Sequence, residues 1–260
     1  ESRVGRVRDA TAGSGHVEAL THDLARSAWQ IFQAIEADGG MMTALVDGKV
    51  HAMIETVRIA RDTDIARRKM PLIGVSEFPN LTEASNKTLA MDVPKDWTIG
   101  EVSPAKAMQT CDRLQQHRLG EGFEALRDAS DAFLEKSGSR PTVFLATLGS
   151  PADFTVRATW MSNLLASGGI DVVTGSPQDL SASKATIACI CSSDALYADE
   201  AEAAARTLAR HGAQHILLAG KPGQMQDQLT AAGVQQFVHA GQNVLTLLGE
   251  LSMLATGDAS

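Results

Sequence analysis

The chain has 260 residues, of which 44% are hydrophobic and 4% aromatic, and its formal net charge is -8. This length allows one large domain or two smaller ones, each with a sizeable core. The acidic balance argues against nucleic acid or an anionic membrane surface as a partner, because both attract basic proteins. No apolar run approaches the length needed to span a bilayer.

The first 78 residues predict two helices and a strand. A glycine-rich turn at Gly13-Ser14-Gly15 leads into a helix with apolar residues three and four apart, which ends at Gly39-Gly40. A second helix is expected at about His51–Arg68 and a strand at Leu72–Val75. These elements do not make a self-sufficient core, and the chain begins at Glu1 without a methionine. We therefore expect the sequence to be a fragment of a longer protein.

The next region predicts a connection followed by two helices. Phe78–Pro104 contains three prolines and little periodicity, which is typical of an interdomain linker or of an arm that lies over a partner. Ala105–Leu119 and Phe123–Leu134 are expected to be amphipathic helices that pack beside the following domain. Ser137–Arg140 is the expected hinge into that domain.

From Thr142 onward, short apolar runs alternate with helical patterns. The predicted strands are Thr142–Leu148, Ile170–Thr174, Ala185–Cys191, His215–Ala219 and Gln235–His239. One helix is predicted to begin at about Pro151. Three more are predicted at Glu200–His211, Gln224–Ala232 and Val244–Ala255. Strands joined by single helices and short loops form a parallel sheet with right-handed crossovers, here a doubly wound sheet of the flavodoxin type.

Ligands of such sheets bind at the carboxyl ends of the strands. The loops expected there are Gly149–Thr155, Gly175–Asp179, Ser192–Tyr197 and Gly220–Gln224. None of them matches a Walker loop, a dinucleotide fingerprint or a nucleophile elbow. Leu148-Gly149-Ser150 has too few glycines to cradle phosphates, and it lacks the paired acids with which a phosphorelay receiver holds Mg²⁺.

The cysteines favour reduced thiols. There are three, Cys111, Cys189 and Cys191, and two of them lie in one predicted buried strand. An odd number in such positions is typical of a cytoplasmic protein without a disulfide framework. Cys189 and Cys191 share a face of their strand, and we expect them to pack in the core and not to form a metal site.

The order of parts resembles the C-terminal half of the methylmalonyl-CoA mutase family. The residues that carry this resemblance are Asp9, Gly13, Ser14, Val17, Glu18, Leu20, Thr21, Trp29, Glu36, Gly39, Gly40, Met41, Ile73, Gly74, Val75 and Phe78. The resemblance implies that residues 1–78 end an acyl-CoA mutase TIM barrel. Residues 79–139 would be a linker arm with two helices, and residues 140–260 a cobalamin-binding-like domain.

The family's cobalamin loop carries the pattern Asp-x-His-x-x-Gly, in which the histidine ligates cobalt. By resemblance, the corresponding residues here are Asp153, Thr155 and Ala158, so the histidine and the glycine are both replaced. A threonine hydroxyl is a poor cobalt ligand, and Asp153 has no imidazole to orient. The family's later contacts become Ser192-Ser193 followed by Asp194, and Ala219-Gly220 followed by Lys221. We expect no catalytic residue, no metal ligand and no bound cofactor on this chain.

These departures are the pattern expected of a non-catalytic, stabilising subunit in a heterodimeric mutase. The resemblance implies a large catalytic subunit as partner, which would hold adenosylcobalamin and interconvert methylmalonyl-CoA and succinyl-CoA. One alternative is a catalytic cobalamin enzyme in which His211 or His239 replaces the missing ligand. Another is a free-standing flavodoxin-like module that binds a different ligand.

Overall fold

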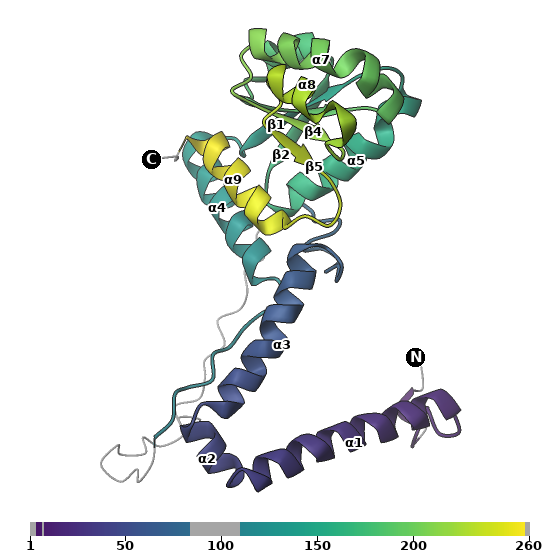
Figure 1. The fold of residues 1–260 in the computed structure, drawn as a ribbon, viewed down its shortest axis with the longest axis vertical. Helices are drawn as coiled ribbons and strands as arrows, with labels where there is room; N and C mark the ends of the chain where they lie inside the picture. Colours follow the sequence, from purple (N-terminus) through teal and green to yellow (C-terminus); the bar gives the residue numbers. More distant parts are fainter. Residues whose placement is uncertain (1–3, 7, 84–109, 258–260) are drawn as a thin grey trace. The chain divides into compact units, whose positions relative to one another are not determined.

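A computed structural model describes residues 4–6, 8–83 and 110–257 of the protein. The chain divides into two compact units, whose elements are labelled in Figure 1. The N-terminal unit comprises Glu1–Val57 and Ala90–Gln115, and the sheet unit comprises Arg58–Leu89 and Gln116–Ser260. Helix α3 (Lys49–Ala66) contains the boundary between them.

The N-terminal unit contains a short 3-10 helix (Val4–Arg6), α1 (Gly15–Ala37), α2 (Gly40–Val46) and the first part of α3. The two long predicted helices are confirmed as α1 and α3. Helix α2 was not predicted, because Gly39-Gly40 indicates only the end of the preceding helix, whereas Gly40 also begins the next one. Gly39 and Gly40 have φ of 100° and 84°, a conformation that glycine adopts freely, and the next helix starts at once.

The predicted strand at Leu72–Val75 is wrong. The Val75 and Ser76 N–H groups both donate to the Leu72 carbonyl at 2.9 Å, and Gly74 has φ of 79°, so the segment is a turn. A strand needs a neighbour to satisfy its backbone groups. Within the described part of the chain, the pairing of this segment is limited to an isolated bridge between Ile73 and Glu77.

The predicted helix at Ala105–Leu119 is wrong over residues 110–118, which have no regular secondary structure and are exposed throughout. Residues 105–109, and residues 84–104 of the predicted arm, lie outside the described residues. A short amphipathic helix is marginal unless its apolar face packs against something. Helix α4 (Glu121–Ser137) does pack, with Phe123 and Ser130 buried, and it confirms the helix predicted at Phe123–Leu134.

The sheet confirms the predicted flavodoxin-type topology. Its strands are β1 (Thr142–Thr147), β2 (Asp171–Gly175), β3 (Ile187–Cys191), β4 (His215–Ala219) and β5 (Gln236–Val238). They lie in the order β2-β1-β3-β4-β5, and every pair is parallel. The point where the strand order reverses, between β1 and β3, is where ligands of such folds bind.

Four helices of the sheet domain confirm predicted ones: α5 (Pro151–Ser167), α7 (Asp194–Arg210), α8 (Gln226–Ala231) and α9 (Val244–Thr256). The short helix α6 (Leu180–Ser183) was not predicted. Short 3-10 turns at Pro177–Asp179 and Gly223–Met225 precede α6 and α8. Helix α7 begins before the predicted Glu200, because the Ser193 hydroxyl accepts a hydrogen bond from the Leu196 N–H and caps it directly after β3.

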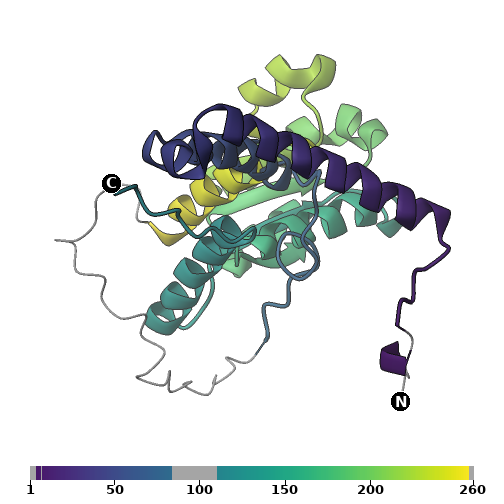
Figure 2. The same cartoon turned by 90° about the horizontal axis from the view of Figure 1, so that it is seen from below.

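Alternate residues of each strand point to opposite faces and build two core layers. One layer packs against α4, α5 and α9 and includes Val143, Leu145, Cys189, Cys191 and Leu217. The other packs against α7 and α8 and includes Phe144, Ala146, Ile190, Ile216 and Leu218. Figure 1 and Figure 2 show α4 and α9 running beside the sheet domain. The prediction that Cys189 and Cys191 pack in the core is confirmed.

Helix α4 is tied to the sheet domain by a buried serine. The Ser130 hydroxyl donates to the Gly169 carbonyl at 2.6 Å, just before β2. Arg140 Nη1 donates to the same hydroxyl at 3.0 Å, and Arg140 Nη2 lies 2.6 Å from Asp131 Oδ1. The helix before the sheet thus packs against the sheet domain, as predicted, and contributes to its core.

Candidate functional site

The carboxyl ends of the parallel strands meet at one edge of the sheet, which we call the cofactor edge. The loops predicted to lie there follow β1, β2, β3 and β4 in the structure. Much of their predicted length is helical. Asp153 and Thr155 already lie in α5, Tyr197 lies in α7, and Pro177–Asp179 is a 3-10 turn.

The loop after β1 is short and closed by its own hydrogen bonds. Asp153 Oδ2 accepts from the Ser150 N–H at 2.9 Å and from the Ser150 hydroxyl at 2.6 Å. Both bonds lower the pKa of Asp153, and the bond from the Ser150 hydroxyl has the larger effect. Gly149 has φ of 77°, and a Cβ there would lie 2.3 Å from Leu196 Cδ1. Asp153 thus caps the start of α5, and the loop packs directly on α7.

Thr155 and Ala158 lie within the first turns of α5. The Thr155 hydroxyl donates to the Pro151 carbonyl of the same helix at 2.5 Å. Ala158 is 9% exposed and belongs to the core layer under α5. By the resemblance, Thr155 stands where the pattern has the histidine that ligates cobalt, and it offers no imidazole. Ala158 stands where the pattern has a glycine, and it carries a side chain.

A buried tyrosine forms hydrogen bonds with backbone groups at the junction of β3 and α7. The Tyr197 hydroxyl accepts from the Ser192 N–H at 2.9 Å and lies 2.9 Å from the Ala219 carbonyl and 3.1 Å from the Ile190 carbonyl. The fully buried Ser192 hydroxyl donates to the Leu148 carbonyl at 3.0 Å. Burial raises the pKa of Tyr197 well above its usual range. The phenol therefore links the ends of β3 and β4 as a neutral group.

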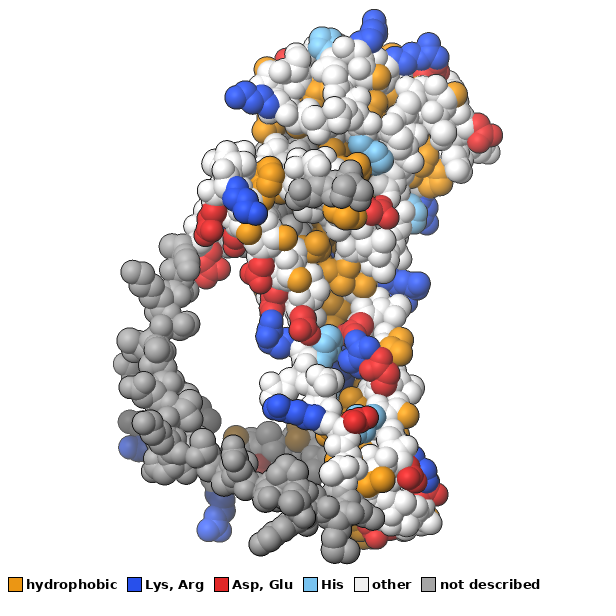
Figure 3. Space-filling view, turned by 90° about the vertical axis from the view of Figure 1, so that its left-hand side faces the viewer, with side chains coloured by type: hydrophobic (Ala, Val, Ile, Leu, Met, Phe, Trp, Pro, Cys, Tyr) orange, Lys and Arg blue, Asp and Glu red, His pale blue; other side chains and the backbone are white. Residues whose placement is uncertain are grey.

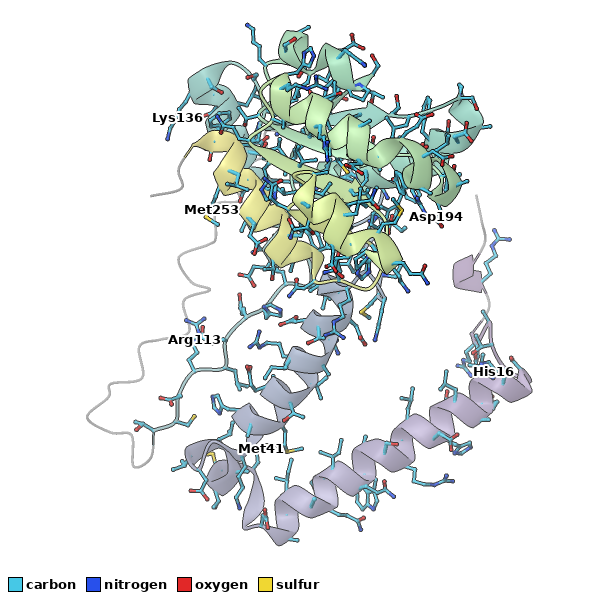
Figure 4. The ribbon with its side chains drawn as sticks, turned by 45° about the horizontal axis from the view of Figure 1, so that its top comes forward. His16, Met41, Arg113, Lys136, Asp194 and Met253 are labelled. Carbon is cyan, nitrogen blue, oxygen red and sulfur yellow. The ribbon has the colours of Figure 1, made fainter. Side chains whose placement is uncertain are left out.

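An arginine from α5 spans the cofactor edge. Arg157 Nη1 donates to the Ser192 carbonyl at 2.7 Å and Nη2 donates to Asp194 Oδ1 at 2.6 Å. Its guanidinium carbon lies 4.8 Å from the centre of the Tyr197 ring, within range of a cation–π interaction. We call these contacts the Arg157 bridge. Figure 4 labels Asp194 at the periphery of the sheet unit, and its side chain is 88% exposed.

The electrostatics of the bridge favour a charged arginine. Burial is the largest influence on the pKa of Arg157 and lowers it, but the hydrogen bonds to Asp194 and Tyr197 outweigh burial, so the pKa is raised. The guanidinium also lies 3.7 Å, measured at Nη1, from where a Cβ on Gly220 would be. Gly220, at the end of β4, thus lies beside the Arg157 guanidinium.

A pocket of about 260 Å³ lies at this edge, lined among others by Arg157, Trp160, Gly220, Lys221 and His239. Pockets for drug-sized ligands are roughly 300–1,000 Å³, so this one is below that range. Trp160 packs against the core layer and is only partly buried. A small group fits in this pocket.

The two candidate replacement histidines lie far apart in the topology. His211 follows the last residue of α7, at the end of the sheet opposite to the cofactor edge, and its N–H bonds to the Thr207 carbonyl. His239 follows β5, and its Nδ1 lies 3.0 Å from the Ala240 carbonyl. Strands β3 and β4 lie between β5 and β1, although His239 lines the same pocket as Arg157 of α5.

The residues at this edge do not fit cobalamin. The position of the cobalt ligand holds a hydroxyl already bonded within its helix, and Arg157 and Asp194 lie over the β3 end where a nucleotide tail would enter. Among the described residues, no group of three or more His, Cys, Asp or Glu side chains could hold a metal ion. Within the same residues, no helix is long and apolar enough to cross a membrane.

Arg157 and Tyr197 were not predicted from the sequence. Two signals could have drawn attention to them. Arg157 lies inside the stretch that corresponds to the cobalamin loop, and Tyr197 is the only tyrosine of the chain.

Sequence comparisons with known proteins identify methylmalonyl-CoA mutases as similar to this chain. A family model described as methylmalonyl-CoA mutase matches residues 1–148. The methylmalonyl-CoA mutase small subunit of Streptomyces virginiae is 39% identical over 256 residues, which is 95% of this chain and 38% of that protein. The probable small subunit of Mycobacterium tuberculosis is 38% identical over 259 residues, 96% of this chain and 38% of that protein.

A methylmalonyl-CoA mutase of Cereibacter sphaeroides, whose name specifies no subunit, is 32% identical over 141 residues, or 51% of this chain and 20% of that protein. The chain thus spans 38% of the length of the two small subunits described above.

Proposed function

The chain belongs to the methylmalonyl-CoA mutase family, and we propose that it acts as the non-catalytic, stabilising subunit of a heterodimeric member. In this proposal a large catalytic subunit holds adenosylcobalamin and interconverts methylmalonyl-CoA and succinyl-CoA. Bound there, the cofactor supplies the radical chemistry of the rearrangement. The names of the similar small subunits support this assignment.

The observation that carries the proposal is the Arg157 bridge across the cofactor edge. A cobalamin on this chain would have to displace the Arg157–Asp194 ion pair and find a cobalt ligand at Thr155. The cost of opening this network comes from its buried groups, which would need new partners, because the exposed Asp194 carboxylate would be solvated by water. The residues that bind cofactor elsewhere in the family would here stabilise the domain itself.

The N-terminal unit supports a role within a larger assembly. Helix α1 has no buried residue although it carries large apolar side chains, among them Leu24 at 62% and Trp29 at 60% exposure. Hydrophobic side chains are visible along the surface in Figure 3. Contiguous exposed apolar surface commonly marks a contact. We propose that residues 1–78 complete a TIM barrel, that residues 79–139 form a linker arm that ends in helix α4, and that residues 140–260 form the degenerate cofactor domain.

We also propose a cytoplasmic location. All three cysteines are free thiols, which the reducing cytoplasm maintains.

Reconstitution tests the assignment. The natural protein that carries this sequence is produced from its whole gene, alone and with the large subunit, and mutase activity is measured. We expect activity only when the large subunit is present. Thr155→Ala and His211→Ala in this chain should leave the activity of the pair unchanged, whereas even the loss of a group that only orients a metal ligand costs about 10–100-fold.

The matched control is replacement of the cobalamin-loop histidine in the large subunit, which should abolish activity. Activity of this chain by itself, or its loss in either of the two variants with the fold intact, would overturn the proposal.

A further inference from the structure

A second, smaller cavity of about 130 Å³ lies in the sheet unit and has no role in the proposed function. It is formed by the end of α3, the turn after it, α5 and the loop between β5 and α9. Arg67, Arg68, Glu77, Trp160 and His239 contribute to its lining. We call it the Arg68 pocket.

Arg68 is a buried cation without hydrogen bonds. Its side chain is 8% exposed, and Nη2 lies 2.6 Å from Glu77 Oε2. Even so, none of Nε, Nη1 and Nη2 donates to an acceptor with good geometry. A guanidinium has five N–H donors in a fixed plane, and buried polar groups are nearly always hydrogen-bonded. The charge of Arg68 is thus partly balanced by Glu77, while its donors remain unused.

The cavity has more donors than acceptors. Glu77 is the only carboxylate in its lining, among the described residues, and it already accepts a hydrogen bond from Asn163 Nδ2. Arg67 adds a second positive charge, and it is exposed where Arg68 is buried. His239 contributes a ring whose Nδ1 is held near the Ala240 carbonyl. The lining thus carries two arginine charges against one carboxylate, and a second negatively charged acceptor is missing.

Arg68 also holds an uncommon backbone conformation. Its φ is 56°, in the left-handed region that glycine adopts without strain and that L side chains rarely adopt. It lies at the end of α3, where its N–H donates to the Ile65 carbonyl at 2.9 Å. Glycine is the usual residue at such a helix end. Arg68 therefore has a side chain at a position where the backbone conformation favours glycine.

We propose that the Arg68 pocket binds a tetrahedral oxyanion, either free inorganic phosphate or the terminal phosphoryl group of a larger ligand. Arginine forms paired, charge-assisted hydrogen bonds with such groups through its planar fork. A water molecule occupies about 30 Å³ in the liquid, so 130 Å³ corresponds to roughly four waters and accepts one small ion. The body of a nucleotide would remain outside the cavity.

Isothermal titration calorimetry of the 260-residue chain with sodium phosphate tests this site. Sodium sulfate, sodium acetate and a nucleoside monophosphate are titrated in parallel, with sodium chloride matching the ionic strength. We expect saturable phosphate binding at one site, and a Kd at least about tenfold higher in Arg68→Gln, because hydrogen bonds to charged groups are the strong ones. Arg61→Gln, an exposed arginine on the same helix, is the matched control and should bind as the unmodified chain does.

The other arms separate the possible ligands. Tighter binding of the monophosphate than of inorganic phosphate would identify a terminal phosphoryl group, and the reverse would identify the free ion. If circular dichroism shows that Arg68→Gln does not fold, His239→Gln takes its place and should also weaken phosphate binding. The proposal is overturned if no anion saturates the site, if acetate binds as well as phosphate, or if the variants that fold all bind phosphate like the unmodified chain.

Discussion

Replacing Gly169 by alanine is expected to destabilise the sheet unit by about 2–5 kcal/mol. Two effects add. Gly169 has φ of 78°, and a Cβ there would lie 2.6 Å from Ser130 Cβ, 2.9 Å from Ser130 Oγ and 3.3 Å from the backbone Cα of Arg127. Since these atoms belong to a fully buried serine and to the backbone of α4, they cannot move aside as the end of a long side chain could. The helix itself must shift.

Gly138→Ala is the matched control. Gly138 has φ of 79°, but no atom lies within 4 Å of the position that a Cβ would take there, so only the backbone strain of about 1–2 kcal/mol applies. The free energy of unfolding of the sheet unit is measured by native-state hydrogen exchange of strand amides. Equal destabilisation by the two substitutions would show that α4 is not clamped against the loop before β2.

Tyr197→Phe is expected to destabilise the sheet unit by about 1–3 kcal/mol, because it leaves buried backbone groups without partners. The Ser192 N–H loses its acceptor, and the carbonyls of Ile190 and Ala219 lose the phenol that lies between them. The ring itself stays, so core packing is retained and the effect isolates the hydroxyl. Faster exchange of the Ser192 amide, together with a lower free energy of unfolding, is the expected observation.

Thr207→Ala on the same helix is the control for this change. Its hydroxyl is exposed and donates to the Ala203 carbonyl at 2.8 Å, so its loss should alter stability by no more than about 0.5 kcal/mol. If Tyr197→Phe is as mild as Thr207→Ala, the phenol does not join the ends of β3 and β4.

The sheet could be predicted because its signals are local. Runs such as Thr142–Thr147 are apolar throughout, as strands buried on both faces must be, and glycines such as Gly168 and Gly169 mark the ends of helices. The segments at Leu72–Val75 and residues 110–118 could not be predicted, because an apolar stretch becomes a strand or a helix only if something packs beside it. Within the described residues, Leu72 and Val75 contact the core, but their segment pairs only through the bridge between Ile73 and Glu77, and residues 110–118 are exposed.

The topology of the sheet was enough to predict where the cofactor edge lies. It was not enough to predict that Arg157 spans this edge. The contact between Arg157 and Asp194 joins residues 37 positions apart. It depends on α7 starting at Ser193, where the alanine-rich pattern predicted a start at Glu200. The role of Tyr197 depends in turn on the same helix start, which points its ring back over the ends of β3 and β4. A residue pattern alone does not contain this geometry.

The most direct test of the closed cofactor edge is a visible absorbance spectrum after incubation with adenosylcobalamin and removal of free cofactor. The whole natural protein, the large subunit and the mixture of the two are compared. We predict no retained colour in this protein alone, and one cofactor per pair of subunits in the mixture. Retained colour in this protein alone, or two cofactors per pair, would contradict the closed edge and would require a cobalt ligand other than Thr155.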